Sequence, residues 1–312
     1  MIRFEYLEPK NLQEATGLLA THGDKARLIA GGTDLLHELK TRHLRPQYVV
    51  NIKRIPGLNS IQWSEGDGLR FGALVTCRML EYSPDVRKWF PMLAETAGIV
   101  GSVQIRSTAT IMGNVCNALP SAEMGPPLLA LNAEITLTGT SGSRTMSLEQ
   151  FITGPRQTAR RQDEIATEIH VPNVPANTGM IYVRHSPRRA MDLAVVGVAA
   201  VVTTDASHDV LQDVRIALGA VAPTPLRARR AEAIVQGQRY SEELLRRAGE
   251  ASGEESKPIS DIRASEEYRR EMVQVLTRRM LHWARERSRL APGEAKILRY
   301  PTSMHFIYTP AA

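Results

Sequence analysis

Cysteine is scarce in this chain, which has only two, Cys77 and Cys116, among its 312 residues. Two thiols cannot build a disulfide framework, and they cannot supply the four thiolates of a cysteine-ligated iron–sulphur cluster. Each thiol is therefore interpreted first as a small buried hydrophobe. Reduced thiols are typical of the cytoplasm, so we expect a cytoplasmic protein.

Long apolar runs are also absent. No stretch approaches the roughly 18 apolar residues that a membrane-spanning helix needs, and residues 1–5 lack the apolar core of a signal peptide. The sequence therefore predicts neither a membrane span nor export.

Charge of one sign is not concentrated anywhere. The chain has 39 Lys+Arg against 33 Asp+Glu, a net charge of +6, and aromatic residues make up only 5% of it. Because the arginines are scattered, the pattern predicts no nucleic-acid-binding module. An anionic cofactor, an acidic partner surface or a solvated surface would each explain the excess of positive charge.

Familiar metal and nucleotide motifs are missing as well. His37 and His43 lie six residues apart, whereas the two histidines of a zincin helix lie four apart. The glycines of residues 66–72 miss the dinucleotide spacing because Phe71 stands where the third glycine belongs. There is no Walker sequence either. We therefore expect no metal site and neither of these nucleotide-binding motifs.

The chain does have the composition of a folded protein, with 43% hydrophobic and 23% charged residues. An apolar stretch at residues 28–30 stops abruptly in Gly31, Gly32, Thr33 and Asp34. Glycine accepts positive φ and lets backbone N–H groups approach a ligand, and successive N–H groups form a nest for phosphate oxygens. The pattern indicates a strand that ends in an anion-binding turn, and a plain turn before a helix is the alternative.

A second stretch of this kind, Thr-Ile-Met-Gly-Asn at residues 110–114, strengthens the first reading. Hydrophobic period and capping residues predict the elements around both stretches. The expected elements are strands at 4–7, 26–30, 48–52, 69–73, 134–138, 165–171, 180–183, 194–203 and 214–221, helices at 91–100 and from Pro126, and helices capped by Asn11, Ser241 and Ser265.

Residues 28–34 and 104–127 together resemble the two pyrophosphate-binding motifs of a known family. It is that of the FAD-binding medium subunits of molybdenum hydroxylases, the carbon monoxide dehydrogenase and xanthine dehydrogenase family. Further similar stretches follow in order at residues 151–155, 188–194 and 217–225. The resemblance covers about residues 1–285.

The resemblance implies an α+β fold. A PCMH-type FAD-binding domain of two α/β subdomains would be followed by a carbon monoxide dehydrogenase flavoprotein C-terminal-like domain, a small antiparallel sheet with helices. Residues 172–179 have the composition of a linker between them. The expected boundaries are 1–175 for the FAD-binding domain, with subdomains of about 1–57 and 58–175, then 179–287 for the C-terminal domain and 288–312 for a tail.

The resemblance also implies which residues bind FAD: Ala30, Gly31, Gly32, Thr33, Asp34, Val100, Thr110, Ile111, Gly113, Asn114, Glu123, Ile165 and Arg184. The two motifs would hold the pyrophosphate, Glu123 a ribose or ribityl hydroxyl, and Val100 and Ile165 the isoalloxazine ring. Arg184 would lie near the pyrimidine edge of the flavin, where relatives tend to have lysine. Met112 departs from the family, which usually has glycine there, and puts a side chain beside the phosphate loop.

No catalytic side chain and no metal ligand is expected in this chain, because the flavin itself carries the electrons. The resemblance implies that electrons come from the [2Fe-2S] clusters of a small partner subunit and leave FAD for an external acceptor. A large molybdopterin subunit would oxidise the substrate. We expect a dimer of heterotrimers, because closed two-fold symmetry is the commonest arrangement.

Two segments are candidates for subunit contact. The last helix carries an apolar stripe that is either core or interface, and residues 300–308 are rich in aromatic side chains. The stripe consists of Tyr268, Met272, Val275, Leu276, Met280 and Trp283.

Two alternative functions remain at this point. A stand-alone flavoprotein oxidoreductase on the same FAD fold would carry its own substrate domain, and the resemblance at residues 188–225 argues against it. A non-catalytic assembly subunit would have lost FAD, and Met112 is the residue that invites this reading.

Overall fold

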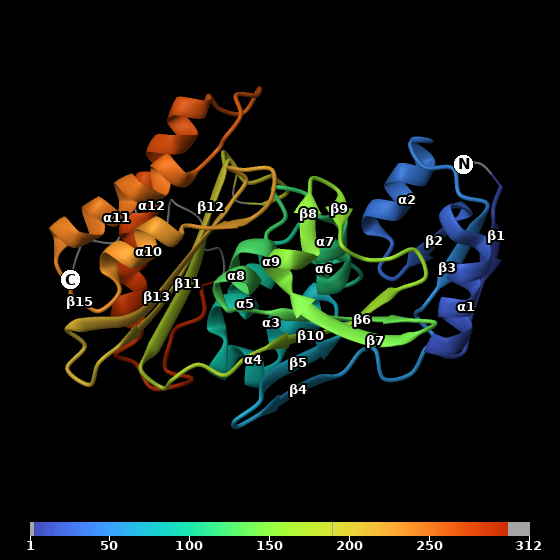
Figure 1. The fold of residues 1–312 in the computed structure, drawn as a ribbon, viewed down its shortest axis with the longest axis horizontal. Helices are drawn as coiled ribbons and strands as arrows, with labels where there is room; N and C mark the ends of the chain where they lie inside the picture. The colour runs from blue at the N-terminus through green and yellow to red at the C-terminus, as the bar shows by residue number, and fades with distance from the viewer. Residues whose placement is uncertain (1–2, 189, 299–312) are drawn as a thin grey trace.

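The structure, a computed structural model, describes residues 3–188 and 190–298. Its elements form three units in a row, each around one main sheet, with the N-terminal unit at one end and the C-terminal helices at the other (Figure 1). The predicted mixture of helices and strands is confirmed. The aromatic tail at 300–308, expected to contact a partner, lies outside the described residues.

The N-terminal unit is a three-stranded parallel sheet in the order β1-β3-β2 with two α-helices. Asn11 caps the first helix as predicted, because its side-chain oxygen accepts the N–H of Glu14 at 2.8 Å. The strand before the glycine pair ends at Ile29, and a helix begins at Thr33. The elements are β1 (Glu5–Leu7), α1 (Leu12–His22), the 3-10 helix η1 (Gly23–Lys25), β2 (Ala26–Ile29), α2 (Thr33–Lys40) and β3 (Tyr48–Asn51).

The second unit is a five-stranded sheet in the order β4-β5-β10-β6-β7, and its pairings are antiparallel. The helix expected at 91–100 ends at Ala97, and residues 103–106 form a further short helix because Ser102 caps it. The elements are β4 (Ile61–Ser64), β5 (Gly68–Gly72), α3 (Cys77–Tyr82), α4 (Pro84–Trp89), α5 (Pro91–Ala97), α6 (Val103–Arg106), α7 (Ile111–Asn117), α8 (Gly125–Ala130), β6 (Glu134–Gly139), β7 (Gly142–Ser147), α9 (Leu148–Phe151), β8 (Ile152–Gly154), β9 (Gln157–Thr158) and β10 (Ile165–Val171).

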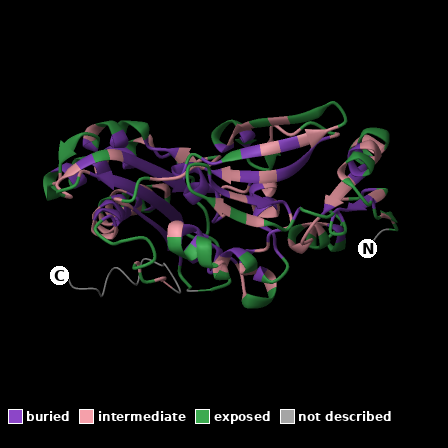
Figure 2. Ribbon diagram, turned by 90° about the horizontal axis from the view of Figure 1, so that it is seen from below, coloured by how far each residue is buried: buried purple, intermediate pink, exposed green. Residues whose placement is uncertain are grey.

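The third unit is the predicted antiparallel sheet with helices. Its strand β12 is buried along its length because Ala199 and Val201 pack into the core of the second unit, while Val198 and Ala200 pack against the C-terminal helices (Figure 2). The elements are β11 (Thr178–His185), β12 (Val196–Thr204), β13 (Val210–Gly219), β14 (Leu226–Arg227), α10 (Arg229–Val235), β15 (Gln238–Arg239), α11 (Glu242–Glu255) and α12 (Glu266–Arg287).

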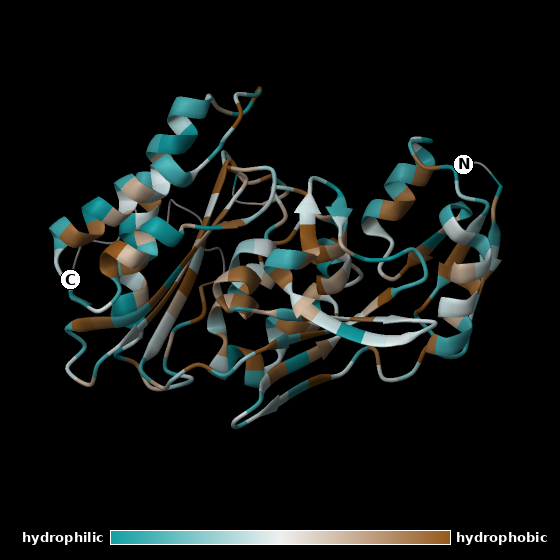
Figure 3. Cartoon of the chain, viewed as in Figure 1, coloured by the Kyte–Doolittle hydropathy of each residue, from teal (hydrophilic) through white to brown (hydrophobic). Residues whose placement is uncertain are grey.

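The buried face of α12 differs from the predicted stripe. Leu276 and Met280 are buried as expected, but Tyr268 is exposed and Arg269 is buried instead. Arg269 can be buried because its guanidinium donates a hydrogen bond to the carbonyl of Val195 at 2.7 Å. Polar and apolar residues are mixed along α11 and α12 (Figure 3). Within the described ranges, no helix has the length and apolar character needed to cross a membrane.

Candidate functional site

A cavity of about 660 Å³ opens between the first two units, and the third unit contributes to its lip. This volume lies within the range of roughly 300–1,000 Å³ that is typical of ligand sites. Most of its lining comes from residues within 27–38, 100–123 and 156–166. Single residues elsewhere complete it: Leu44, Ile52, Ala73, Arg188, Met191, Asp192, Leu193 and Arg263. The cavity is therefore the place to test the residues predicted to bind FAD.

The first wall is the loop from β2 to α2, where two glycines serve different purposes. Gly32 has φ +76°, in the left-handed region that residues with a Cβ avoid. Gly31 allows a close approach instead, because a Cβ there would lie 2.1 Å from the backbone oxygen of Thr108. Gly32 thus shapes the turn. Gly31 lets this loop touch the backbone of Thr108, which leads into the second wall of the cavity.

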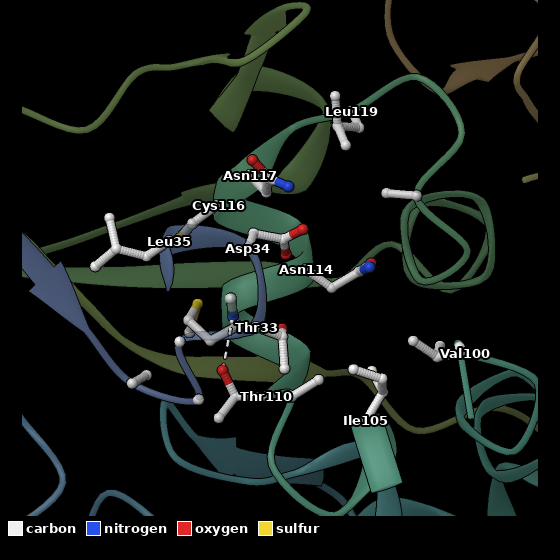
Figure 4. A pocket seen from close by; sticks show the side chains of 18 of the residues that line it. Thr33, Asp34, Leu35, Val100, Ile105, Thr110, Asn114, Cys116, Asn117 and Leu119 are labelled. Carbon is white, nitrogen blue, oxygen red and sulfur yellow. Dashed lines mark hydrogen bonds between the residues drawn. The ribbon is translucent and has the colours of Figure 1, made fainter. Parts of the chain in front are cut away.

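The second wall is the start of α7, so the prediction of a second glycine turn is wrong. Thr110 is the N-cap, and its hydroxyl accepts the N–H of Gly113 at 3.0 Å, drawn as a dashed line in Figure 4. Gly113 is helical, and a Cβ there would meet the Thr110 hydroxyl oxygen at 2.8 Å. Both walls thus bring a helix N-terminus to the cavity, and Asp34 and Asn114 point into the same space (Figure 4). Helix N-termini favour anions.

Most of the predicted site residues line the cavity, and two do not. Ile111 is fully buried in the core, and its N–H donates to the carbonyl of Val75 at 3.0 Å. Arg184 lies on β11, fully buried behind the cavity wall. Binding of FAD by the others stays a prediction. The predicted residues at the cavity are Ala30, Gly31, Gly32, Thr33, Asp34, Val100, Thr110, Gly113, Asn114, Glu123 and Ile165.

Arg184 connects three parts of the cavity from behind. Its Nη1 donates to Glu123 Oε1 at 3.1 Å, to the carbonyl of Ile99 at 3.1 Å and to the carbonyl of Asp192 at 3.3 Å. Ile99 precedes Val100 in one wall of the cavity, Glu123 belongs to another wall, and Asp192 belongs to the lip that the third unit contributes. Burial raises the pKa of the Glu123 carboxyl, and the Arg184 guanidinium opposes this rise. Arg184 therefore holds the walls in place, and its position near the pyrimidine edge of the flavin stays a prediction.

Several cavity residues were missed by the sequence analysis because no motif assigned them a role, although Arg188 begins the family-like stretch at 188–194. Five of them are arginines: Arg27, Arg156, Arg160, Arg188 and Arg263. In the sequence, the scattered excess of positive charge was the one sign that arginines would lie at the cavity.

Cys116 also lines the cavity, from the interior of α7. Burial raises the pKa of its thiol to about 11. The thiol is therefore protonated at neutral pH and is a poor nucleophile. Met112 lines the cavity too, but its side chain belongs to the buried core, which leaves room beside the phosphate loop.

The cavity fits FAD in both of its chemical parts. The two helix N-termini and the nearby arginines suit a pyrophosphate, which is doubly negative. Val100, Ile105 and Ile165 give the cavity an apolar stretch that suits a flat ring system. The contact of Gly31 with the backbone of Thr108 creates a cradle that any larger residue would fill.

Comparisons with known proteins match both parts of the chain to flavoproteins. The profile described as FAD binding domain in molybdopterin dehydrogenase matches residues 2–174, and that of the CO dehydrogenase flavoprotein C-terminal domain matches residues 181–284. The carbon monoxide dehydrogenase medium chain of Hydrogenophaga pseudoflava is 33% identical over 285 residues, covering 91% of this chain and 98% of that one. The nicotine 6-hydroxylase medium subunit of Paenarthrobacter nicotinovorans is 34% identical over 276 residues, covering 88% and 95%. A solved structure of the Hydrogenophaga carbon monoxide dehydrogenase, which lacks the Mo-pyranopterin moiety, contains a chain with TM-score 0.88 and 34% identity, over 92% of this chain and 99% of that one.

Proposed function

We propose that this chain, which belongs to the family of FAD-binding medium subunits of molybdenum hydroxylases, passes electrons from [2Fe-2S] clusters of a partner subunit through FAD to an external acceptor. As a member of this family it is an FAD-containing oxidoreductase subunit. The observation that carries the proposal is the meeting of two helix N-termini at one cavity, in a chain with only two cysteines.

Bound FAD supplies a carrier that takes up and releases electrons. The protein's part is to bind and orient it. Residues 30–34 and the N-terminus of α7 would hold the pyrophosphate, and Glu123 would accept a hydrogen bond from a hydroxyl of the ribose or ribityl chain. Val100 and Ile165 would lie against the isoalloxazine ring, while Arg184 keeps the walls at their spacing. No side chain of the chain is assigned a catalytic proton transfer.

The partners follow from what this chain cannot supply. Two cysteines cannot supply the four thiolates of an all-cysteine [2Fe-2S] cluster, so the clusters belong to a small subunit, and molybdopterin belongs to a large one. We propose a dimer of such heterotrimers, working in the cytoplasm. We also propose the domain boundaries expected from the sequence, at 1–175, 179–287 and 288–312.

Affinity purification of the tagged chain from its native source tests this proposal. We expect a small iron–sulphur protein and a large molybdenum protein to co-purify, because the part of the chain that the structure describes has no cluster of side chains that could hold a substrate-oxidising metal. Flavin, iron and molybdenum analysis of the purified material is the measurement. If the chain purifies without partners and oxidises an organic substrate at roughly 1–10³ s⁻¹, a rate ordinary for enzymes, the proposal is wrong. The chain is then a stand-alone flavoenzyme.

The FAD is expected to be bound without a covalent link. Neither phosphate-binding stretch contains a histidine, cysteine or tyrosine, and the Cys116 thiol nearby is kept protonated by burial. Acid precipitation should therefore release the flavin into the supernatant, where its absorption spectrum is measured. A Cys116→Ala variant is the control. Yellow colour that stays in the pellet of the wild-type protein, and leaves it in the variant, would identify a thioether link and contradict the expectation.

A further inference from the structure

A second cavity, of about 360 Å³, lies apart from the one proposed to hold FAD. Most of its lining comes from β4 and the turn after it, from α4, from the connection between β10 and β11, and from residues 290–295 after α12. Among the described residues, none lines both cavities. In Figure 1, β4 and α4 lie at the lower edge of the second unit, away from α2 and α7. The volume falls in the range of roughly 300–1,000 Å³ that small-molecule sites have.

Two stacked tryptophans form one side of this second cavity. Trp63 of β4 and Trp89 of α4 have ring centroids 4.3 Å apart and ring planes at 7° to each other, and both are half-buried. The indole N–H of Trp63 is already used, because Nε1 donates to Asn173 Oδ1 at 3.2 Å. Trp63 therefore offers a ligand its ring surface and not a hydrogen bond, which favours a flat aromatic group.

The guanidinium of Arg287 borders the second cavity, but its hydrogen bonds go to the protein. It donates to the two carboxylate oxygens of Glu95, at 2.7 and 2.9 Å, and to the carbonyl of Met180 at 2.9 Å. Glu95 is buried, and its Oε1 also accepts the N–H of Leu298 at 2.8 Å. The wall at residues 290–295 is thus fixed to the second unit on both sides.

This wall lies beyond the part of the chain that matches the family. The match to the flavoprotein C-terminal profile ends at residue 284, whereas residues 290–295 come after α12. The second cavity is therefore not a feature that the family profile defines.

Two side chains of opposite charge remain at the second cavity. The Lys88 ammonium lies 4.5 Å from the centroid of the Trp89 ring, which holds it beside the cavity. Glu65 lies in the exposed turn after β4. Among the residues that the structure describes, neither Lys88 nor Glu65 has an ion-pair partner. A ligand with one anionic and one cationic group would supply a partner for each.

We infer that the second cavity binds a small aromatic zwitterion, of which an aromatic amino acid is the simplest example. The ring of the ligand stacks on the tryptophan pair, its carboxylate pairs with Lys88 and its ammonium pairs with Glu65. This inference goes beyond the proposed function and does not depend on it, because the second cavity shares none of its described residues with the cavity proposed to hold FAD.

Equilibrium dialysis of the purified full chain against radiolabelled L-phenylalanine tests the inference. We expect one saturable site per chain. Two derivatives of the probe test its charges, because N-acetyl-L-phenylalanine lacks the ammonium and L-phenylalanine methyl ester lacks the carboxylate. Each is expected to compete about fivefold more weakly than the free amino acid, as for the loss of one partly exposed ion pair.

Two variants assign these charges to residues. Lys88→Gln should bind phenylalanine about fivefold more weakly and lose the preference for it over the methyl ester. Glu65→Gln should lose the preference over the N-acetyl derivative instead. Both side chains are exposed, so the fold should be kept. Lys10→Gln is the matched control, because Lys10 is an exposed lysine before α1 in the N-terminal unit and does not line the second cavity.

Three results would overturn the inference. The first is wild-type protein that shows no saturable binding. The second is binding that Lys88→Gln and Glu65→Gln leave unchanged, together with equal competition by both derivatives, since the ligand would then not be recognised as a zwitterion. The third is unchanged binding by a Trp63→Ala protein that circular dichroism shows to be folded, which would place the amino acid elsewhere in the chain.

Discussion

A Gly31→Ala variant is expected to lose FAD binding. The added Cβ would lie 2.1 Å from the backbone oxygen of Thr108 and 2.9 Å from its carbonyl carbon, and neither atom belongs to a side chain that could turn away. The two walls of the cavity would have to separate, and donors on opposite sides of the pyrophosphate could no longer act together. Losing two charge-assisted hydrogen bonds of roughly 1.5–3 kcal/mol each weakens binding by on the order of 100-fold or more.

The measurement is the ratio of flavin to protein after gel filtration, with circular dichroism to show that the variant is folded. Gly17→Ala is the matched control, because a Cβ at Gly17 in α1 would meet nothing within 4 Å and alanine favours a helix. A Gly31→Ala protein that keeps stoichiometric FAD would show that the contact of the two walls does not shape the site.

Gly32→Val tests the other glycine of the same loop. Gly32 needs positive φ, and a Cβ there would lie 3.0 Å from the Ile29 side chain. The loop has to change its conformation, so we expect FAD binding to weaken by a few kcal/mol, about the value of one or two charge-assisted hydrogen bonds. Full retention of flavin would mean that this turn only connects β2 to α2.

Arg184→Met is expected to destabilise the folded protein strongly. The substitution leaves the Glu123 carboxyl buried without its guanidinium, and breaking a buried ion pair by removing one partner costs about 3–5 kcal/mol. It also frees the wall beside Val100 and the lip at Asp192, because both give carbonyl contacts to Arg184. Urea unfolding followed by circular dichroism measures the change.

The loss should depend on pH in a direction set by Glu123. Burial already raises the pKa of this carboxyl, and removing Arg184 takes away the group that lowers it. A carboxyl whose pKa is raised on folding stabilises the fold below its unfolded pKa and ceases to do so as pH rises through the folded value. The variant should therefore be least stable relative to wild type at neutral pH, and closer to it in acid.

A double variant, Arg184→Met with Glu123→Leu, provides the control. It removes both charges, and replacing a buried pair by apolar residues is often neutral or stabilising. We expect most of the lost stability to return. FAD binding should be weaker than in the wild-type protein, since the double variant removes the Glu123 carboxylate from the cavity. Equal destabilisation in the single and double variants would mean that the carbonyl contacts of Arg184, and not the ion pair, hold the walls.

Much of the fold could be predicted because its signals are local. Asn11 caps α1, Ser241 caps α11 and Ser265 caps α12, each through a hydrogen bond to a backbone N–H three residues on. The glycine pair at 31–32 also predicted its turn, because the positive φ of Gly32 depends on neighbouring residues alone. The close approach of Gly31 to Thr108 depends on a distant segment and could not be predicted.

Predictions failed where a local pattern fitted two conformations. The sequence at 110–114 was interpreted as a turn because it resembles the first motif, but threonine at its start caps a helix. The stripe on α12 was predicted from apolar residues at helical spacing, whereas the packing of the helix buries a face that also carries Arg269.

The sequence by itself determined the caps, the turn at Gly32, the strands of the third sheet and, through an ordered series of motifs, the family. Only the tertiary structure decided that Gly31 is needed for contact with Thr108, that Arg184 lies behind the cavity and not in it, and that Met191 and Leu193 border the cavity. The reason is physical. Caps and turns arise from atoms a few residues apart, whereas a cavity wall is made by residues from distant segments whose approach depends on how the whole core packs.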